Sequence, residues 1–189
     1  FSKVVVANRG AVAARVLRAL NALGVHSLAV YSDADRGAPW LEMASETAHI
    51  GGAPARESYL NQDAILEAAR RARADALHPG YGFLSENAGF AARVEQAGMR
   101  FIGPSPRWID AMGHKTRARE LAGEHGLPLG RGSGVLPPEP DAILRAAEAI
   151  GYPVLVKPAA GGGGIGMLPA RTPEQLLAAV ERAASMAER

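Results

Sequence analysis

The residues with the clearest chemical potential lie in the stretch VLVKPAAGGGGIGML, residues 154–168. Glycine loses more backbone entropy on folding than any other residue, so a glycine run is either a flexible linker or a loop whose amides approach a ligand closely. A linker is usually flanked by polar, low-complexity sequence, whereas strand-like apolar runs flank this one. The context therefore favours a ligand-binding loop, which contains Gly161, Gly162, Gly163, Gly164 and Gly166.

The position of this loop between two strand-like runs restricts the kind of site it can form. A Walker loop needs Gly-Lys-Ser/Thr opening a helix, and a dinucleotide fingerprint also needs a helix after its glycines. Here a second apolar run follows, so we expect a hairpin flap whose backbone amides can line a phosphate chain. Lys157 then supplies a mobile cation for a phosphate, the alternative being an edge-strand lysine on a solvated face.

The elements that must position such a site begin with an open α/β domain. Short β-branched and apolar runs predict strands at 3–7, 26–32, 75–80 and 100–103, and helical periodicity predicts helices at 11–23, 61–74 and 86–97. Asn61 is a plausible N-cap of the second helix. A strand, a helix and a second strand within about 30 residues form a βαβ unit, so we expect a parallel sheet.

The pattern changes after Pro106. Residues 107–126 are mostly helical with a break around Gly113, and residues 127–140 are rich in proline and glycine, which fits a connector between domains. A further helix is expected at 141–150, before the glycine loop. The chain starts at Phe1 and stops inside a polar helical stretch, residues 173–189, so we expect a fragment of something longer.

Composition limits the classes of function. With 48% hydrophobic and 21% charged residues the chain is typical of globular proteins, and its net charge of +2 is too small to indicate a nucleic-acid surface. No apolar run approaches the roughly 20 residues of a membrane-spanning helix. The absence of cysteine excludes disulfides, thiolate metal sites and cysteine nucleophiles. We expect a soluble, cytoplasmic protein without nucleic-acid or membrane partners.

Several motifs together resemble biotin carboxylase, the component that the biotin-dependent carboxylases share. VLVK before the glycines resembles the flap of ATP-grasp enzymes. Each motif alone is a weak signal, but together the motifs stand in the same order as in the family and extend over the whole chain. The other motifs are ANRG (7–10), AVYSDAD (29–35), ESYLN (57–61), HPGYGFLSEN (78–87), FIGPSP (101–106) and MGHK (112–115). The resemblance implies a Rossmann-like parallel-sheet domain at 1–110, a connector at 111–135 and the start of an ATP-grasp lid at 136–189.

The resemblance also implies roles for individual residues. Lys115 and Lys157 match the lysines that contact the nucleotide phosphates, and the five glycines match the flap that closes over ATP. Tyr81 matches a tyrosine beside the biotin pocket, and Glu86 lies in the same motif. That motif follows a predicted strand, and open α/β sheets place ligands at the carboxyl edge. We interpret His78 as a hydrogen-bonded strand-end histidine, not a catalytic base.

The sequence departs from the family pattern at three positions. Ala11 stands where the family usually has glutamate, and His114 where it has aspartate. Ile165 replaces a flap lysine or arginine, which resembles the urea carboxylase branch. In the family, the acidic metal ligands, the bicarbonate-binding region and the catalytic glutamate lie beyond the position of Arg189. The resemblance therefore assigns no catalytic residue and no metal ligand to this chain, and we expect the chain alone to be inactive.

The implied function is the MgATP-dependent activation of bicarbonate as carboxyphosphate, followed by transfer of CO2 to biotin on a carrier domain. The implied partners are carrier and carboxyltransferase domains or subunits, together with a second copy in a homodimer, and the final acceptor is an acyl-CoA or urea. Two alternatives stay open: another ATP-grasp ligase, of the carboxylate-amine or carbamoyl phosphate type, and an assembly module without activity. An unliganded glycine flap is expected to be mobile near residues 161–166.

Overall fold

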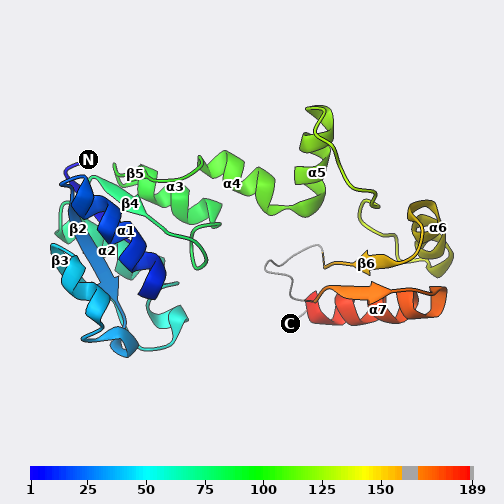
Figure 1. The fold of residues 1–189 in the computed structure, drawn as a ribbon, viewed down its shortest axis with the longest axis horizontal. Helices are drawn as coiled ribbons and strands as arrows, with labels where there is room; N and C mark the ends of the chain where they lie inside the picture. The colour runs from blue at the N-terminus through cyan, green and yellow to red at the C-terminus, as the bar shows by residue number, and fades with distance from the viewer. Residues whose placement is uncertain (159–165, 188–189) are drawn as a thin grey trace. The chain divides into compact units, whose positions relative to one another are not determined.

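The computed structural model of the chain describes residues 1–158 and 166–187 (Figure 1). It divides into two compact units, Phe1–Asp110 and Ala111–Arg189, each of which is described by itself. The predicted glycine flap, Gly161 to Gly164 with its expected mobility, lies outside the described residues, and only Gly166 falls within them. The predicted division into 1–110, 111–135 and 136–189 stays a prediction. Among the described residues, no helix combines the length and apolar character that a membrane crossing requires.

The first unit is built on a parallel five-stranded sheet with the order β3-β2-β1-β4-β5. The strands are β1 Lys3–Val6, β2 His26–Tyr31, β3 Glu46–His49, β4 Ala76–His78 and β5 Arg100–Phe101, and every pairing is parallel. The predicted parallel α/β fold is confirmed. Strand β3 was not predicted, because ETAH is a short, mostly exposed edge strand without the apolar run of a buried strand.

Helices cover both faces of this sheet. Helix α1, Gly10–Ala22, and the 3-10 helix η2, Pro39–Met43, pack on one face with Val4 and Val6 of the central strand. Helices α2, Gln62–Arg71, and α3, Ala88–Gln96, pack on the other face around Val5. Burial on both faces explains why β1 is a continuous valine run instead of an alternating one.

Asparagine side chains fix where two helices begin. Asn61 Oδ1 accepts a hydrogen bond from the Ala64 amide at 3.1 Å, which confirms the predicted N-cap of α2. Asn87 Oδ1 accepts from the Phe90 amide at 2.8 Å, so α3 begins at Ala88 and not at Glu86. A cap residue keeps an extended backbone, and Glu86 therefore lies in the turn before the helix.

The second unit contains a two-stranded hairpin sheet. Strands β6, Val154–Val156, and β7, Leu168–Ala170, pair antiparallel, which confirms that strands stand on both sides of the glycine stretch. Helices α6, Pro140–Ile150, and α7, Pro173–Ala187, form a small core with the hairpin. Helix α4, Pro106–Gly113, runs across the boundary between the two units, and α5, Lys115–Glu124, belongs to the second. The two helices agree with the predicted break near Gly113, and residues 127–139 contain no helix or strand.

Candidate functional site

The carboxyl edge of the parallel sheet brings together the loops that carry the candidate site of the first unit. Strand β1 lies between β2 and β4, so the chain leaves β1 toward one side of the sheet while β4 pairs on the other. Open α/β sheets bind ligands at such a switch of strand order, outside the carboxyl ends of the strands. The loops that meet there are residues 7–9, after β1, and residues 79–87, after β4.

Asn8 joins these two loops. Its side chain is buried, with 2% of the residue exposed, and Nδ2 donates to the carbonyl oxygens of Pro79 at 2.8 Å and Tyr81 at 2.9 Å. Its Oδ1 accepts from the Arg9 amide at 2.9 Å. Gly80, between the two carbonyls, has φ of +67°, and a Cβ there would lie 2.7 Å from Asn8 Nδ2 and 2.7 Å from Val12 Cγ1. The close approach therefore needs glycine at this position.

The loop presents its predicted ligand-facing side chains to solvent. Tyr81 is 74% exposed although its carbonyl is held by Asn8, and the Glu86 side chain is also exposed. His78 Nδ1 accepts from the Gly80 amide at 3.0 Å, and burial lowers the pKa of its imidazole. His78 thus is the hydrogen-bonded strand-end residue that the sequence indicated. The biotin-side roles of Tyr81 and Glu86 stay predictions.

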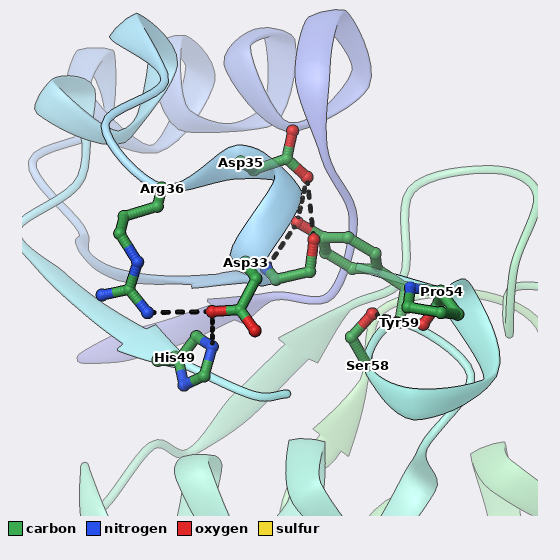
Figure 2. Close-up of polar contacts among 8 residues, drawn as sticks. Asp33, Asp35, Arg36, His49, Pro54, Ser58 and Tyr59 are labelled. Atoms are coloured by element: carbon green, nitrogen blue, oxygen red, sulfur yellow. Dashed lines mark hydrogen bonds and ion pairs between the residues drawn. The ribbon is translucent and has the colours of Figure 1, made fainter. Parts of the chain in front are cut away.

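A buried carboxylate, Asp35, ties together loops from the same edge. Arg9 Nε and Nη2 bind its two oxygens at 2.6 and 2.5 Å, and the Tyr59 hydroxyl donates to Oδ2 at 2.6 Å. The Ser32 amide in turn donates to the Tyr59 hydroxyl at 3.1 Å. Figure 2 shows Asp35 and Tyr59 directed toward one another from different parts of the chain. The cluster thus links residues that follow β1, β2 and β3.

The pKa values of this cluster follow from its hydrogen bonds. The bond from Arg9 is the largest influence on Asp35 and lowers the pKa of its carboxyl group despite the opposing effect of burial. The same bond raises the pKa of Arg9. Burial, together with the hydrogen bond to Asp35, raises the pKa of Tyr59 to about 12. At neutral pH the carboxylate is therefore charged and the tyrosine hydroxyl remains a donor.

Phe83 provides a second attachment for the 79–87 loop. Its ring stacks on Tyr59, with ring centroids 5.2 Å apart and an interplanar angle of 26°. Its φ is +44°, in the left-handed region that a bulky residue rarely adopts. Such a conformation persists when the surrounding structure determines it, and the stack on Tyr59 is a contact that does so.

A neighbouring cluster of ion pairs is exposed and contributes less to stability. Asp33 Oδ1 lies 2.9 Å from both Arg36 Nη2 and His49 Nε2 (Figure 2). The hydrogen bond from Arg36 is the largest influence that lowers the pKa of Asp33. All three side chains are more than a third exposed, and ion pairs of this kind contribute little to stability.

A separate candidate site is the hairpin of the second unit. Lys157 directly follows β6 and is exposed, and Gly166, with φ of +76°, comes shortly before β7. These two residues therefore lie at the ends of the segment that joins the paired strands. Lys115 is the first residue of α5, but its side chain lies outside the described part of the structure. Tyr81 and Glu86 share a loop of the other unit.

Lysine is rare in this chain, which has three lysines and eighteen arginines. Lys3 is accounted for, since its Nζ pairs with Glu46 and donates to the Ala72 carbonyl. The other two are Lys115 and Lys157, the residues predicted to contact phosphates. Lysine and arginine differ in shape and hydration, so lysine at these positions of an arginine-rich chain adds weight to a specific role.

No cluster of three or more histidine, aspartate or glutamate residues suited to a metal ion occurs within residues 1–158 and 166–187. The structure does reveal site residues to which the sequence analysis gave no role: Asn8, Arg9, Asp35 and Tyr59. Each stands in a motif used there only for the family resemblance. For Asn8, Arg9 and Asp35 the available signal was their position shortly after predicted strands, because the carboxyl ends of parallel strands share one edge. Tyr59 had no such signal, since it lies well beyond β3.

Comparison with known families agrees with this arrangement of two units. The family described as "Biotin carboxylase, N-terminal domain" matches residues 1–109, and the family described as "Carbamoyl-phosphate synthase L chain, ATP binding domain" matches residues 114–189. The class is thus an N-terminal α/β domain followed by the start of an ATP-grasp domain. The chain belongs to the biotin carboxylase family.

Individual relatives cover most of this chain. It is 46% identical to biotin carboxylase 2 of Bacillus subtilis, over 96% of this chain and 41% of that protein. It is 46% identical to the biotin carboxylase of Halalkalibacterium halodurans, over 93% of this chain and 39% of that protein. The chain thus spans about 40% of the length of these curated relatives.

Solved structures give the same result. The biotin carboxylase–β-γ-ATP complex from Campylobacter jejuni matches with a TM-score of 0.92 and 42% identity, over 97% of this chain and 41% of that chain. The biotin carboxylase domain dimer of the 2-oxoglutarate carboxylase from Hydrogenobacter thermophilus, with MgADP, ADP and bicarbonate, matches with a TM-score of 0.91 and 41% identity. That match covers 98% of this chain and 41% of the other.

The contact between Gly80 and Asn8 predicts a difference between two glycines of one loop. Gly80 and Gly82 have similar φ values, +67° and +72°, so Gly→Ala strains the backbone similarly at both, but a Cβ on Gly82 meets open space. We expect Gly80→Ala to lower the free energy of unfolding by about 1–3 kcal/mol more than Gly82→Ala, because its methyl group displaces Asn8 or Val12. Urea denaturation measures the unfolding free energy of both variants, and equal losses of stability would contradict the close contact of Gly80 with Asn8 and Val12.

The Arg9–Asp35 pair predicts an acid-dependent stability. The folded-state pKa of Asp35 lies below its ordinary value of 3.8, so its stabilisation is present above that value and is lost as the pH falls through the lowered pKa. Asp35→Asn should reduce the unfolding free energy at pH 7 and flatten its fall in acid. Asp33→Asn is the comparison variant: the pKa of Asp33 is also lowered, but its carboxylate is exposed, so solvent screening should make its effect on stability smaller. Chemical denaturation across pH measures both, and an identical acid dependence of the two variants would refute the assignment.

Proposed function

We propose that this chain is the N-terminal part of a biotin carboxylase, which uses MgATP and bicarbonate to carboxylate biotin on a carrier domain. The observation that carries the proposal is the match of both units, in order, to the N-terminal and ATP-binding families over residues 1–109 and 114–189. The solved relatives named above were captured with β-γ-ATP and with MgADP and bicarbonate, by their own descriptions. The chain spans about 40% of its relatives, so the complete reaction is proposed for the full-length protein.

The nucleotide side of the proposed function is assigned to the hairpin of the second unit. Phosphoryl transfer depends mainly on positioning and on neutralising phosphate charge. An exposed lysine after β6 and a glycine with positive φ before β7 provide a cation and a backbone free of side chains at the two ends of the flap. Lys157, Lys115 and the glycine run are the residues we assign to the ATP phosphates. ATP thus fits the residues present.

Magnesium is assigned differently. The part of the chain that the structure describes contains no suitable cluster of carboxylates, and no step is derived through the ion. When bound with ATP, magnesium would neutralise phosphate charge. We propose that its ligands and the catalytic residues lie in the remainder of the full-length protein.

The biotin side of the proposed function is assigned to the 79–87 loop of the first unit. Tyr81 offers an exposed aromatic ring on a backbone fixed by Asn8, and Glu86 offers an exposed carboxylate in the same loop. An exposed ring on a fixed backbone suits contact with a small bicyclic ligand such as biotin, because little conformational entropy is lost on binding. We assign both residues to this side.

The final acceptor and the partners are proposed at a coarser level. The acceptor is an acyl-CoA or another carboxylate-bearing metabolite, or urea if Ile165 in the flap marks the urea carboxylase branch. The partners are biotin carrier and carboxyltransferase domains or subunits, and a second copy of the chain. The description of one solved relative as a dimer supports the last of these. The cytoplasmic location stays a prediction.

A carbamoyl phosphate type of ligase is the second candidate, because the family matched by residues 114–189 is described from carbamoyl-phosphate synthase. The match of residues 1–109 to the biotin carboxylase N-terminal domain favours the first candidate. Biotin dependence of ADP release by the full-length protein separates the two. An assembly module without activity would bind no MgATP.

The nucleotide assignment predicts a specific loss of affinity. In the full-length protein, Lys157→Ala should weaken MgATP binding about tenfold or more, because an ammonium–phosphate contact is lost, and Lys157→Arg should restore only part of it. Arg171→Ala is the matched control, since Arg171 is an exposed cation that follows β7, the other strand of the hairpin. Isothermal titration calorimetry measures each affinity. Equal affinities of Lys157→Ala and Arg171→Ala would exclude Lys157 from the site.

The placement of the catalytic residues outside this chain predicts that residues 1–189 alone are inactive. The purified 189-residue chain should show no bicarbonate-dependent ATP hydrolysis above buffer, while the full-length protein under the same conditions releases ADP. A coupled assay for ADP measures both. Bicarbonate-dependent turnover by the chain alone would overturn this placement.

A further inference from the structure

We propose that Tyr59 is a positioning residue that holds the 79–87 loop through its ring contact with Phe83, and so orients the loop that carries Tyr81 and Glu86. The proposal deepens the proposed function, because the loop is the assigned biotin side of the site. Tyr59 itself is 2% exposed and is not placed against a substrate. Its effect is therefore transmitted through the loop.

Tyr59 has a fixed orientation. Its hydroxyl donates to Asp35 Oδ2 at 2.6 Å and accepts from the Ser32 amide at 3.1 Å, so both its donor and an acceptor site are used inside the protein. The preceding residue, Ser58, is fully buried, and its hydroxyl donates to the Pro54 carbonyl at 3.1 Å (Figure 2). This hydrogen bond stabilises the turn that carries Tyr59.

The hydrogen-bond partner of the Tyr59 hydroxyl, Asp35, is itself held in place. Asp35 is a buried carboxylate, and a buried charge is stable only when it is paired and hydrogen-bonded. Arg9 supplies two hydrogen bonds from the start of α1, and its guanidinium also lies 5.8 Å from the Tyr59 ring centroid. Arg9, Asp35 and Tyr59 therefore form one connected hydrogen-bonded cluster.

The Arg9–Asp35–Tyr59 cluster contacts the 79–87 loop through Phe83. Phe83 stacks on Tyr59 and keeps a positive φ of 44°. Asn8 holds the loop at the carbonyls of Pro79 and Tyr81. The backbone from 79 to 83 is thus fixed at both ends, while the Tyr81 ring between them remains exposed. Loss of the Tyr59–Phe83 contact would leave the loop held by Asn8 and by the buried side chain of Leu84, and would loosen the backbone around Phe83.

The test uses the full-length protein with Tyr59→Phe, which removes the hydroxyl but keeps a ring, and Phe83→Ala, which removes the stacked ring. Tyr31→Phe is the matched control, because Tyr31 is a partly buried tyrosine at the end of β2 that contacts His49. Two readouts are taken: hydrogen–deuterium exchange of peptides that cover 79–87, and the KM values for biotin and ATP. The amides of Ser85 and Asn87, bonded to the Gly82 and Leu84 carbonyls, report on the loop.

The expected result is faster exchange in the 79–87 peptides of Tyr59→Phe and Phe83→Ala, with exchange in α1 and α2 unchanged. The KM for biotin should rise about fivefold or more in both variants, because small misplacements of binding groups are costly. The KM for ATP should change by less than about twofold, and Tyr31→Phe should match the wild type in every readout.

Two results would overturn the proposal: unchanged exchange of the loop in Tyr59→Phe, or faster exchange spread evenly over the first unit, which indicates a general structural role. Equal rises in both KM values would also count against it. Failure of the proposed function is distinguishable, because the wild type would then show no biotin-dependent turnover. The exchange comparison would still support or refute the positioning of the loop.

Discussion

The ion pair between Arg9 and Asp35 holds together the edge of the sheet on which the candidate biotin side is built. In a parallel sheet all strands end at the same edge, so the loops that follow them must share a limited space. Asp35, nearly excluded from solvent, accepts from Arg9 after β1 and from Tyr59 after β3. One carboxylate therefore fixes loops that are distant in the sequence, and Tyr59 and Asn8 extend that order to the loop after β4.

In the proposed function the second unit meets a different requirement, which is to place a cation and backbone amides around a phosphate chain. Its hairpin sheet is held by α6 and α7, whose buried side chains form one core with Val156 and Ala170. Lys157 follows directly from the packed end of β6, so a rigid element carries a flexible side chain. A rigid loop in the first unit suits the proposed ligand biotin, which has a defined shape. A flexible lysine in the second unit suits the proposed contact with the ATP phosphates.

Much of the fold could be predicted from the sequence because its central strands are buried on both faces and appear as valine and leucine runs. The cap of α2 and the strands on both sides of the glycine stretch were predictable for similarly local reasons. Strand β3 was not, since an exposed edge strand needs no apolar run. The Arg9–Asp35–Tyr59 contacts were not predictable either, because their partners are 24 and 26 residues apart and only the folded sheet brings them together. For the site, the family resemblance supplied the roles of Tyr81, Glu86, Lys115 and Lys157, whereas the residues that hold the 79–87 loop came from the geometry.

The most direct test of this account is the rate of ADP release by the full-length protein with MgATP and bicarbonate, measured with and without added biotin. A biotin carboxylase has an acceptor site that completes its reaction, so the account predicts bicarbonate-dependent ADP release that rises when biotin is added. Bicarbonate-dependent release that is unaffected by biotin over a wide concentration range would contradict the account and favour another ATP-grasp ligase.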